Sequence, residues 1–273
     1  MRITDVRPIL VSKVYSDDEV WRWSGGEVRV WHSTLVQIFT DKGVYGLGEM
    51  GTGHYLPEAA RAICDSISQM LIGRDPFEIE VLQRKLYKLG ANWGRRGIAM
   101  GVISGIENAL WDLKGKALGL PVHSLLGGKH RDRIRAYASG GMAQPLESLK
   151  EEVASYRQRG FTAVKVRGGF SAKKDVEIAR AAREAAGPDM DVMLDAGQGY
   201  VPEPWSVMEA IEVTKALAEL GLFFLEEPVR TDEIDCYAQV RAGSAVPVAG
   251  GGDGWSLFQF EGPGGAKPPG LPQ

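Results

Sequence analysis

The sequence predicts an α/β protein in which a small α+β domain is followed by a series of parallel β/α units. In the first half of the chain, strand-like segments come first and helical segments follow without alternation, which is typical of an α+β domain. From Ile134 on, short apolar segments alternate with helical ones in units of about 30 residues. The pattern fits either a doubly wound sheet or a closed barrel. The predicted strands of this region end near Tyr137, Arg167, Asp195, Glu226 and Ala249.

The first domain is expected to begin with strands. Residues 34–40 alternate between apolar and polar side chains, and the alternation resumes over residues 44–49. The Asp-Lys-Gly sequence at 41–43 supplies a turn between them, so the whole segment predicts a β-hairpin. The preceding segment, 16–26, is expected to be a loop that carries two tryptophans.

Helices are expected to follow the hairpin. Pro57 suits the first turn of a helix, and the apolar residues of 98–117 keep helical spacing until Gly119 ends it. Residues 46–51 match the nucleotide-binding pattern GxGxxG, but they follow a hairpin strand, no helix is expected to begin at Gly51, and the next elements are helices and not a second parallel strand, so we expect no nucleotide site there. We expect three regions: the first domain at 1–128, the β/α region at 129–260, and a tail rich in glycine and proline at 261–273.

Composition limits the classes of function. The chain has 273 residues, 44% of them hydrophobic and 25% charged, which is enough to bury a core. A formal net charge of −3 offers no basic surface for a phosphate backbone, so we expect a small polar ligand and no nucleic acid. The start of the chain does not resemble a signal peptide, and no apolar run reaches the roughly 20 residues of a membrane span. Cys64 and Cys236 lack the spacing of disulfide or zinc sites, and we expect a cytoplasmic protein with no membrane partner.

Charged residues mark the ends of three predicted strands. In the segment 161–167, the strand period of two puts Lys165 and Arg167 on one face. Two buried cations are costly unless anions stand opposite them, so the pattern predicts a negative cluster close by. Asp195 and Glu226 end the next two strands, and the carboxyl ends of parallel strands are where such folds build their sites.

These four side chains predict a base assisted by a metal ion. Two converging carboxylates favour a hard divalent cation such as Mg²⁺, which prefers oxygen ligands. Partial burial, the charge of Arg167 and a nearby metal would all lower the pKa of Lys165 toward neutrality, so that it could take a proton. Arginine stays charged. We therefore assign Lys165 as the general base and Arg167 as its electrostatic support.

Each signal alone also has an ordinary structural explanation. Lys165 could be a surface lysine, and Asp195 or Glu226 could cap the helix that follows its strand. Glu227 is expected to point away from Glu226, so a structural salt bridge explains it equally well. Two apolar residues on the outward face of the same strand are expected to pack beneath the helices, Phe223 and Leu225.

Taken together, these motifs resemble a known family. Lys165-Val-Arg167, then Asp195, then Glu226-Glu227-Pro228 follow one another on successive β/α units. Their order is similar to that of the base motif and the first two magnesium ligands of the mandelate racemase and muconate lactonizing enzyme family, in the enolase superfamily. Two segments of the first half resemble the capping domain of that family, 46–49 and 107–116, and the resemblance covers about residues 1–260.

The resemblance implies a capping domain followed by a (β/α)8 TIM-type barrel. In such enzymes Mg²⁺ holds a substrate carboxylate while a lysine or histidine removes the neighbouring proton, and the metal stabilises the resulting enediolate. Asp195 and Glu226 would be the metal ligands. The 21–26 loop would lie over the barrel mouth and help to select the substrate. We accordingly expect Trp23, in that loop, and Tyr137, at the end of the first barrel strand, to contact a hydroxy acid or sugar acid.

Several positions depart from the family pattern. The third metal ligand is usually a glutamate, and Gly252 occupies its place here. Asp253, displaced by one residue, is the remaining candidate for that ligand. Gly197 stands where the family often has an asparagine. About five of the eight barrel strands fit after Ile134, so we expect a partial barrel. We hypothesise a truncated or frame-shifted product, which resequencing of the gene would test.

Two functions follow from these residues. The first is a magnesium-dependent lyase or isomerase that abstracts the α-proton of a hydroxy acid, as a sugar-acid dehydratase or a racemase-like enzyme does. The second is a catalytically inactive fragment that acts as a binding or assembly module, supported by Gly252 and by the strands that do not fit. Because an open sheet leaves its edges uncovered, we also expect a homo-oligomer.

Overall fold

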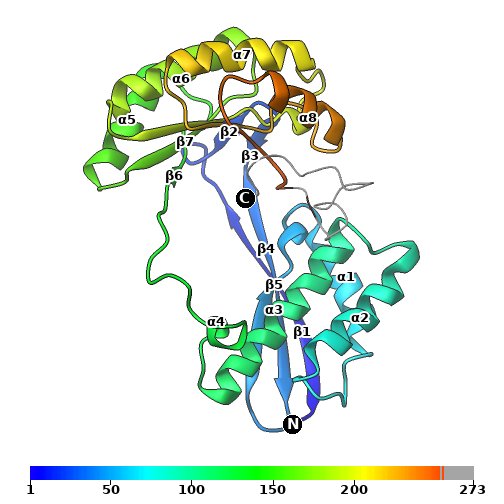
Figure 1. Cartoon of the computed structure of the whole chain (residues 1–273). Coiled ribbons are helices and arrows are strands. Elements are labelled where there is room, and N and C mark those ends of the chain that lie inside the picture. The colour runs from blue at the N-terminus through cyan, green and yellow to red at the C-terminus, as the bar shows by residue number, and fades with distance from the viewer. Residues whose placement is uncertain (253, 255–273) are drawn as a thin grey trace. The chain divides into compact units, whose positions relative to one another are not determined.

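The computed structural model describes residues 1–252 and 254, which form two compact units (Figure 1). The first unit contains residues 1–16 and 30–133, and the second contains residues 17–29 together with the chain from Ile134 on. An antiparallel sheet with helices and a parallel five-stranded sheet confirm the predicted capping domain and partial barrel. The predicted tail lies outside the described residues. In this part of the chain, no helix has the length and apolar character needed to span a membrane.

The first unit is built on an antiparallel sheet in the order β1-β4-β5. Its strands are β1 (Ile3–Val14), β4 (Val30–Thr40) and β5 (Tyr45–Glu49), and β4 and β5 confirm the predicted hairpin. The helices are α1 (Pro57–Ser68), α2 (Ile79–Leu89), α3 (Ile98–Leu118) and α4 (Val122–Leu125). Two 3-10 turns, η1 (Gly51–His54) and η2 (Gly90–Asn92), connect them.

Two glycines let β5 lie directly against α3. A methyl group at Gly46 would come within 1.9 Å of the carbonyl oxygen of Ala109, and one at Gly48 within 2.0 Å of the carbonyl oxygen of Gly105. Only residues without a Cβ atom permit this approach. The first two glycines of the pattern at 46–51 are therefore explained by packing of the strand on the helix. Gly119 ends α3 in a left-handed conformation with φ of 65°, as its position in the sequence predicts.

The second unit is built on a parallel sheet in the order β10-β9-β8-β7-β6. Its strands are β6 (Ala138–Ser139), β7 (Ala163–Arg167), β8 (Asp191–Asp195), β9 (Phe224–Glu226) and β10 (Val248–Ala249). They end at or close to the predicted residues. Each strand pairs with the next one in the sequence, without the reversal of order that defines a doubly wound sheet. The helices between them are α5 (Leu146–Gln158), α6 (Ala172–Ala186), α7 (Val207–Glu219) and α8 (Ile234–Gly243).

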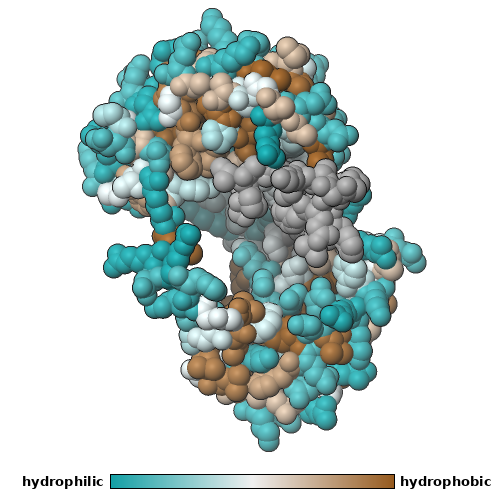
Figure 2. Space-filling model, viewed as in Figure 1, coloured by the Kyte–Doolittle hydropathy of each residue, from teal (hydrophilic) through white to brown (hydrophobic). Residues whose placement is uncertain are grey.

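The helices cover one face of this sheet and enclose the core. Alternate strand residues pack there, among them Val164, Val166, Val192, Leu194, Leu225 and Val248. The outer margin of the helical layer is mostly hydrophilic, as expected for helices whose apolar sides face a sheet (Figure 2). Leu225 is fully buried as predicted, but the same prediction is wrong for Phe223, which is 49% exposed. Phe223 precedes β9, so the strand alternation that placed it under the helices does not apply to it.

The segment expected to be a loop near the start of the chain forms a β-hairpin that belongs to the second unit. Its strands are β2 (Trp21–Trp23) and β3 (Gly26–Val28). The N–H of Ala143 donates a hydrogen bond of 2.7 Å to the carbonyl oxygen of Arg22. The ring of Trp23 lies edge-on to that of Tyr200, with 5.6 Å between the ring centroids. These contacts attach the hairpin to the loops at the carboxyl ends of the parallel strands.

One arginine links the C-terminal ends of α6 and α7 to the residue that precedes β8. Arg183 of α6 donates hydrogen bonds of 2.6 to 3.0 Å to four carbonyl oxygens. They belong to the residues that follow α6 and α7 and precede β8, namely Gly187, Met190, Leu220 and Gly221. A guanidinium group can serve all four because its five N–H donors form a rigid fork.

We expect the replacement of Arg183 by methionine to lower the free energy of unfolding by about 2–3 kcal/mol, because four carbonyl groups lose a charged donor while the aliphatic packing is kept. Urea denaturation followed by circular dichroism measures the change. Arg180→Met, at an exposed position of the same helix, is the matched control and should stay within about 0.5 kcal/mol of the wild type. Equal stability of the two variants would contradict the role given to Arg183.

Candidate active site

Three neighbouring strands bring the charged side chains to one end of the parallel sheet. Arg167, Asp195 and Glu226 are the last residues of β7, β8 and β9. The strand register pairs Arg167 with Asp195, and Asp195 with Glu226. Lys165 lies two residues before Arg167 on β7, so both side chains leave the same face. The carboxyl ends of these strands therefore form one site.

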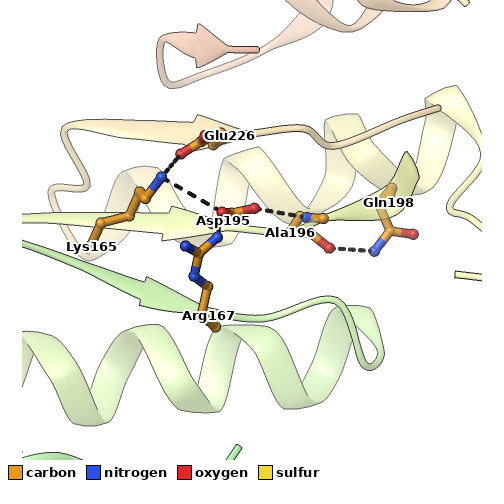
Figure 3. Close-up of polar contacts among 7 residues, drawn as sticks. Lys165, Arg167, Asp195, Ala196, Gln198 and Glu226 are labelled. Atoms are coloured by element: carbon orange, nitrogen blue, oxygen red, sulfur yellow. Dashed lines mark hydrogen bonds and ion pairs between the residues drawn. The ribbon is translucent and has the colours of Figure 1, made fainter. Parts of the chain in front are cut away.

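Both cations are paired with the two carboxylates (Figure 3). The Nζ atom of Lys165 donates a hydrogen bond to Glu226 and lies 3.6 Å from Oδ2 of Asp195. Arg167 forms an ion pair with Asp195, whose Oδ1 accepts a hydrogen bond of 3.0 Å from the N–H of Gly197. The side chains of Lys165, Asp195 and Glu226 are only 6%, 6% and 4% exposed. The negative cluster predicted from the two cations is therefore present.

A cavity of about 250 Å³ adjoins this cluster. The four residues of the cluster line the cavity, and three glycines in its lining contribute no side chain that would fill it. Trp23 was expected at the site from the sequence, and it is one of the residues that line the cavity. Tyr137 is not among the described lining residues: it is 41% exposed, and its ring centroid lies 5.6 Å from Nζ of Lys165. The other residues that contribute to the lining are Ser24, Gly168, Gly197, Tyr200, Glu227 and Gly252.

The electrostatics of Lys165 differ from the sequence prediction. Burial acts to lower the pKa of Lys165, but the hydrogen bond to Glu226 and the negative charges of Asp195 and Glu226 outweigh it, so the pKa lies above the ordinary lysine value. Burial and the charge of Asp195 likewise raise the pKa of Glu226. The predicted lowering assumed a metal ion beside Lys165 and stays a prediction; in this arrangement Nζ bonds directly to the carboxylates that were expected to hold that ion.

Three lining residues other than glycine were not predicted as site residues. Glu227 is 5% exposed and lines the same cavity as Glu226, although strand alternation was expected to turn it away. The strand ends at Glu226, and Glu227 takes a left-handed conformation with φ of 48°. Such conformations of non-glycine residues are rare and often occur at functional sites. Ser24 and Tyr200 lie in a turn and in the 3-10 helix η3 (Gln198–Tyr200), where no sequence periodicity indicates a direction.

Two carboxylates of this site are ligands of the kind that Mg²⁺ uses. Asp195 and Glu226 place two carboxylates side by side, and Mg²⁺ is commonly bound through one or two carboxylates with water and substrate oxygens completing its shell. Within residues 1–252 and 254, no group of three or more His, Cys, Asp or Glu side chains is arranged to hold a metal ion. Gly252 lines the cavity without a side chain, and the predicted ligand Asp253 lies outside the described residues.

Comparison with known families matches both parts of the chain. Residues 19–127 match the model described as the mandelate racemase / muconate lactonizing enzyme N-terminal domain. Residues 148–262 match the model described as enolase C-terminal domain-like. The two matches follow one another in the order of the two units.

Individual relatives agree with these matches. D-galactarolactone cycloisomerase of Agrobacterium fabrum is 41% identical over 221 residues, which are 80% of this chain and 56% of that protein. The crystal structure of an enolase superfamily member from Polaromonas sp. JS666 superposes with a TM-score of 0.83 at 32% identity, over 95% of this chain and 68% of that one. The structure of an L-talarate/galactarate dehydratase mutant with Mg and L-glucarate gives a TM-score of 0.81 at 29% identity, over 91% and 63% of the two chains. The chain thus spans a little over half the length of the first of these relatives.

Proposed function

The chain belongs to the mandelate racemase and muconate lactonizing enzyme family of the enolase superfamily, and from this premise we propose that its site abstracts the α-proton of a hydroxy acid carboxylate with the help of Mg²⁺. The observation that carries the proposal is the convergence of one buried lysine and two buried carboxylates in a single cavity. Buried charged groups are costly to keep, and they gather mainly where a site uses them.

In this proposal Lys165 is the base. Its Nζ atom, in the neutral form, takes the α-proton, and the electron pair of the broken C–H bond moves toward the substrate carboxylate. Arg167 adds positive charge beside the same cavity. Lys165 can act only after its bonds to Asp195 and Glu226 are loosened, since both carboxylates favour the protonated lysine.

Asp195 and Glu226 would hold the metal ion. When bound there, Mg²⁺ supplies positive charge that offsets the two carboxylates and orients the substrate carboxylate. Carboxylates that held such an ion would stabilise the lysine ammonium less, which would lower the pKa of Lys165 from its raised value. The same two side chains thereby control both the position of the substrate and the protonation of the base.

The relatives support a sugar acid as the substrate class. A cycloisomerase of D-galactarolactone and a dehydratase solved with L-glucarate are both similar to this chain. A polyhydroxylated substrate also suits a cavity that combines the ring of Trp23 with the polar side chains of Ser24, Tyr200 and Glu227. We propose a sugar-acid dehydratase or a racemase-like enzyme.

Deuterium exchange tests the proposal. The chain is incubated with Mg²⁺ and a set of sugar acids in D₂O, and mass spectrometry detects deuterium at the α-carbon of the acid or at the β-carbon of the 2-keto product that loss of water leaves. Retention of the hydroxyl would indicate racemase-like chemistry, and loss of water would indicate dehydration. If every acid remained free of deuterium while titration showed bound Mg²⁺, the proposal would be contradicted.

A binding role without turnover is the second candidate. It is favoured by Gly252, which lines the cavity but offers no carboxylate. The two candidates differ in their response to the metal: specific binding of Mg²⁺ at micromolar concentration favours the enzyme, and no binding at millimolar concentration favours the second role.

A further inference from the structure

A buried aspartate accepts hydrogen bonds from the backbone of the loop between β7 and α6, residues 168–171. Asp175, in the first turn of α6, is fully buried. Its Oδ2 accepts a hydrogen bond of 2.7 Å from the N–H of Gly169, and its Oδ1 accepts one of 3.2 Å from the N–H of Phe170. The loop also lies tightly on the carboxylate, because a methyl group at Gly168 would come within 2.8 Å of Oδ2.

The opposite side of this loop faces the candidate active site. The N–H of Gly168 donates a hydrogen bond of 2.8 Å to the carbonyl oxygen of Asp195, and Gly168 lines the cavity. A methyl group at Gly169 would lie 2.5 Å from the carbonyl oxygen of Ala196 and 2.6 Å from Oγ of Ser24, in the turn of the β2–β3 hairpin. The loop is thus a single layer of backbone between Asp175 and two segments that line the cavity.

The carboxylate of Asp175 is kept at a cost in stability. Burial raises its pKa to about 6, against the opposing effect of the backbone N–H groups and of Lys174, the charged neighbour that acts on it. At neutral pH the fold therefore holds an ionised group that would be more favourable in water. A destabilising residue beside a site is expected where function requires the order that it provides.

We propose that Asp175 is a positioning residue of the candidate active site. Its carboxylate fixes the conformation of the β7–α6 loop. The loop in turn fixes the direction of the Arg167 side chain and the position of the β2–β3 hairpin. The ordering of loop and hairpin does not depend on what the site does. Its consequence for catalysis rests on the proposed function.

The buried carboxylate of Asp175 should make the stability of the fold depend on pH. Its folded-state pKa of about 6 lies above the ordinary value of 3.8, so the stability that it contributes is fully present below pH 3.8 and is lost as the pH rises through about 6. We expect the melting temperature of the wild type, relative to that of Asp175→Asn, to fall between pH 4 and pH 7. A difference that stays constant over this range would contradict the raised pKa of Asp175.

Amide hydrogen exchange of the full chain tests the positioning role. Asp175→Asn keeps the volume but replaces one acceptor oxygen by an NH₂ group that faces a backbone donor. We expect exchange in residues 168–171 and 21–28 to become about tenfold faster, as for the loss of one hydrogen bond, while β8 and α7 stay at the wild-type rate. Glu177→Gln, an exposed acid two residues on in the same helix, should leave every segment unchanged.

A second variant keeps the test decisive if Asp175→Asn does not fold. Gly169→Ala leaves Asp175 intact but presses on Ser24, and the backbone φ of 89° at this position is unfavourable for alanine, so the hairpin should again exchange faster. Wild-type exchange over residues 21–28 in a folded Asp175 or Gly169 variant would overturn the proposal. A uniform rise across the sheet and all its helices would also overturn it, because Asp175 would then act only on global stability. Neither result depends on catalytic activity, so the proposal can fail or succeed apart from the proposed function.

Discussion

Replacing Lys165 by alanine should slow the Mg²⁺-dependent exchange of the α-proton of a sugar acid by about 10²–10⁴-fold, the usual contribution of a general base. Lys165 is the one lysine among the described residues that line the cavity, and arginine cannot take the proton. The measurement is sharpest in a chain that carries Gly252→Glu. Deuterium incorporation is followed by mass spectrometry under single-turnover conditions.

A control variant and a control measurement accompany this experiment. Lys173→Ala removes an exposed lysine from α6 and should leave the rate unchanged. Mg²⁺ affinity should not fall in Lys165→Ala, because Nζ bonds to the carboxylates that would hold the ion, and its removal leaves them open to the metal. If the α-proton of the substrate still exchanged at the wild-type rate in Lys165→Ala, the assignment of Lys165 as the base would be contradicted.

Gly252→Glu should raise the affinity of the chain for Mg²⁺ by at least about tenfold. The position lines the same cavity as Asp195 and Glu226, and the family resemblance implies a third carboxylate there. A further negative oxygen ligand increases affinity for a hard cation because it adds both a ligand and a charge. Isothermal titration calorimetry in a buffer without other divalent ions measures the change.

The control for this substitution separates charge from size. Gly252→Gln introduces a side chain of nearly the same volume without the charge, and it should gain much less affinity. If the glutamate and glutamine variants bound Mg²⁺ as weakly as the wild type, position 252 would not belong to the metal site.

The positions of the strand ends could be predicted because apolar runs and their charged last residues are local features. Lys165 and Arg167 share a face by the period of a strand, and the need of buried cations for anions predicted their pairing with Asp195 and Glu226. The direction of the pKa shift of Lys165 could not be predicted in the same way. It depends on which oxygen atoms Nζ contacts, and those distances are set by three strands together.

Other features depend on the tertiary fold alone. The segment 17–29, which contains the β2–β3 hairpin, belongs to the second unit although it lies within the sequence of the first; the family resemblance implied a place for the 21–26 loop at the barrel mouth, but no local pattern of residues does so. Glu227 enters the cavity because its backbone leaves the strand conformation at the residue where alternation was assumed to continue. Asp175 has the sequence context of an ordinary first-turn acid, and its role behind the β7–α6 loop depends on burial that only packing produces.

The central claim, that Asp195 and Glu226 form a metal site beside Lys165, is tested most directly by titrating the wild-type chain and Asp195→Asn with Mg²⁺ by calorimetry. Asparagine keeps the shape of the side chain and removes its charge. We predict saturable binding to the wild type and a loss of affinity of at least about tenfold in the variant. Saturable binding of equal strength in both proteins, or no binding to the wild type at millimolar Mg²⁺, would contradict the claim.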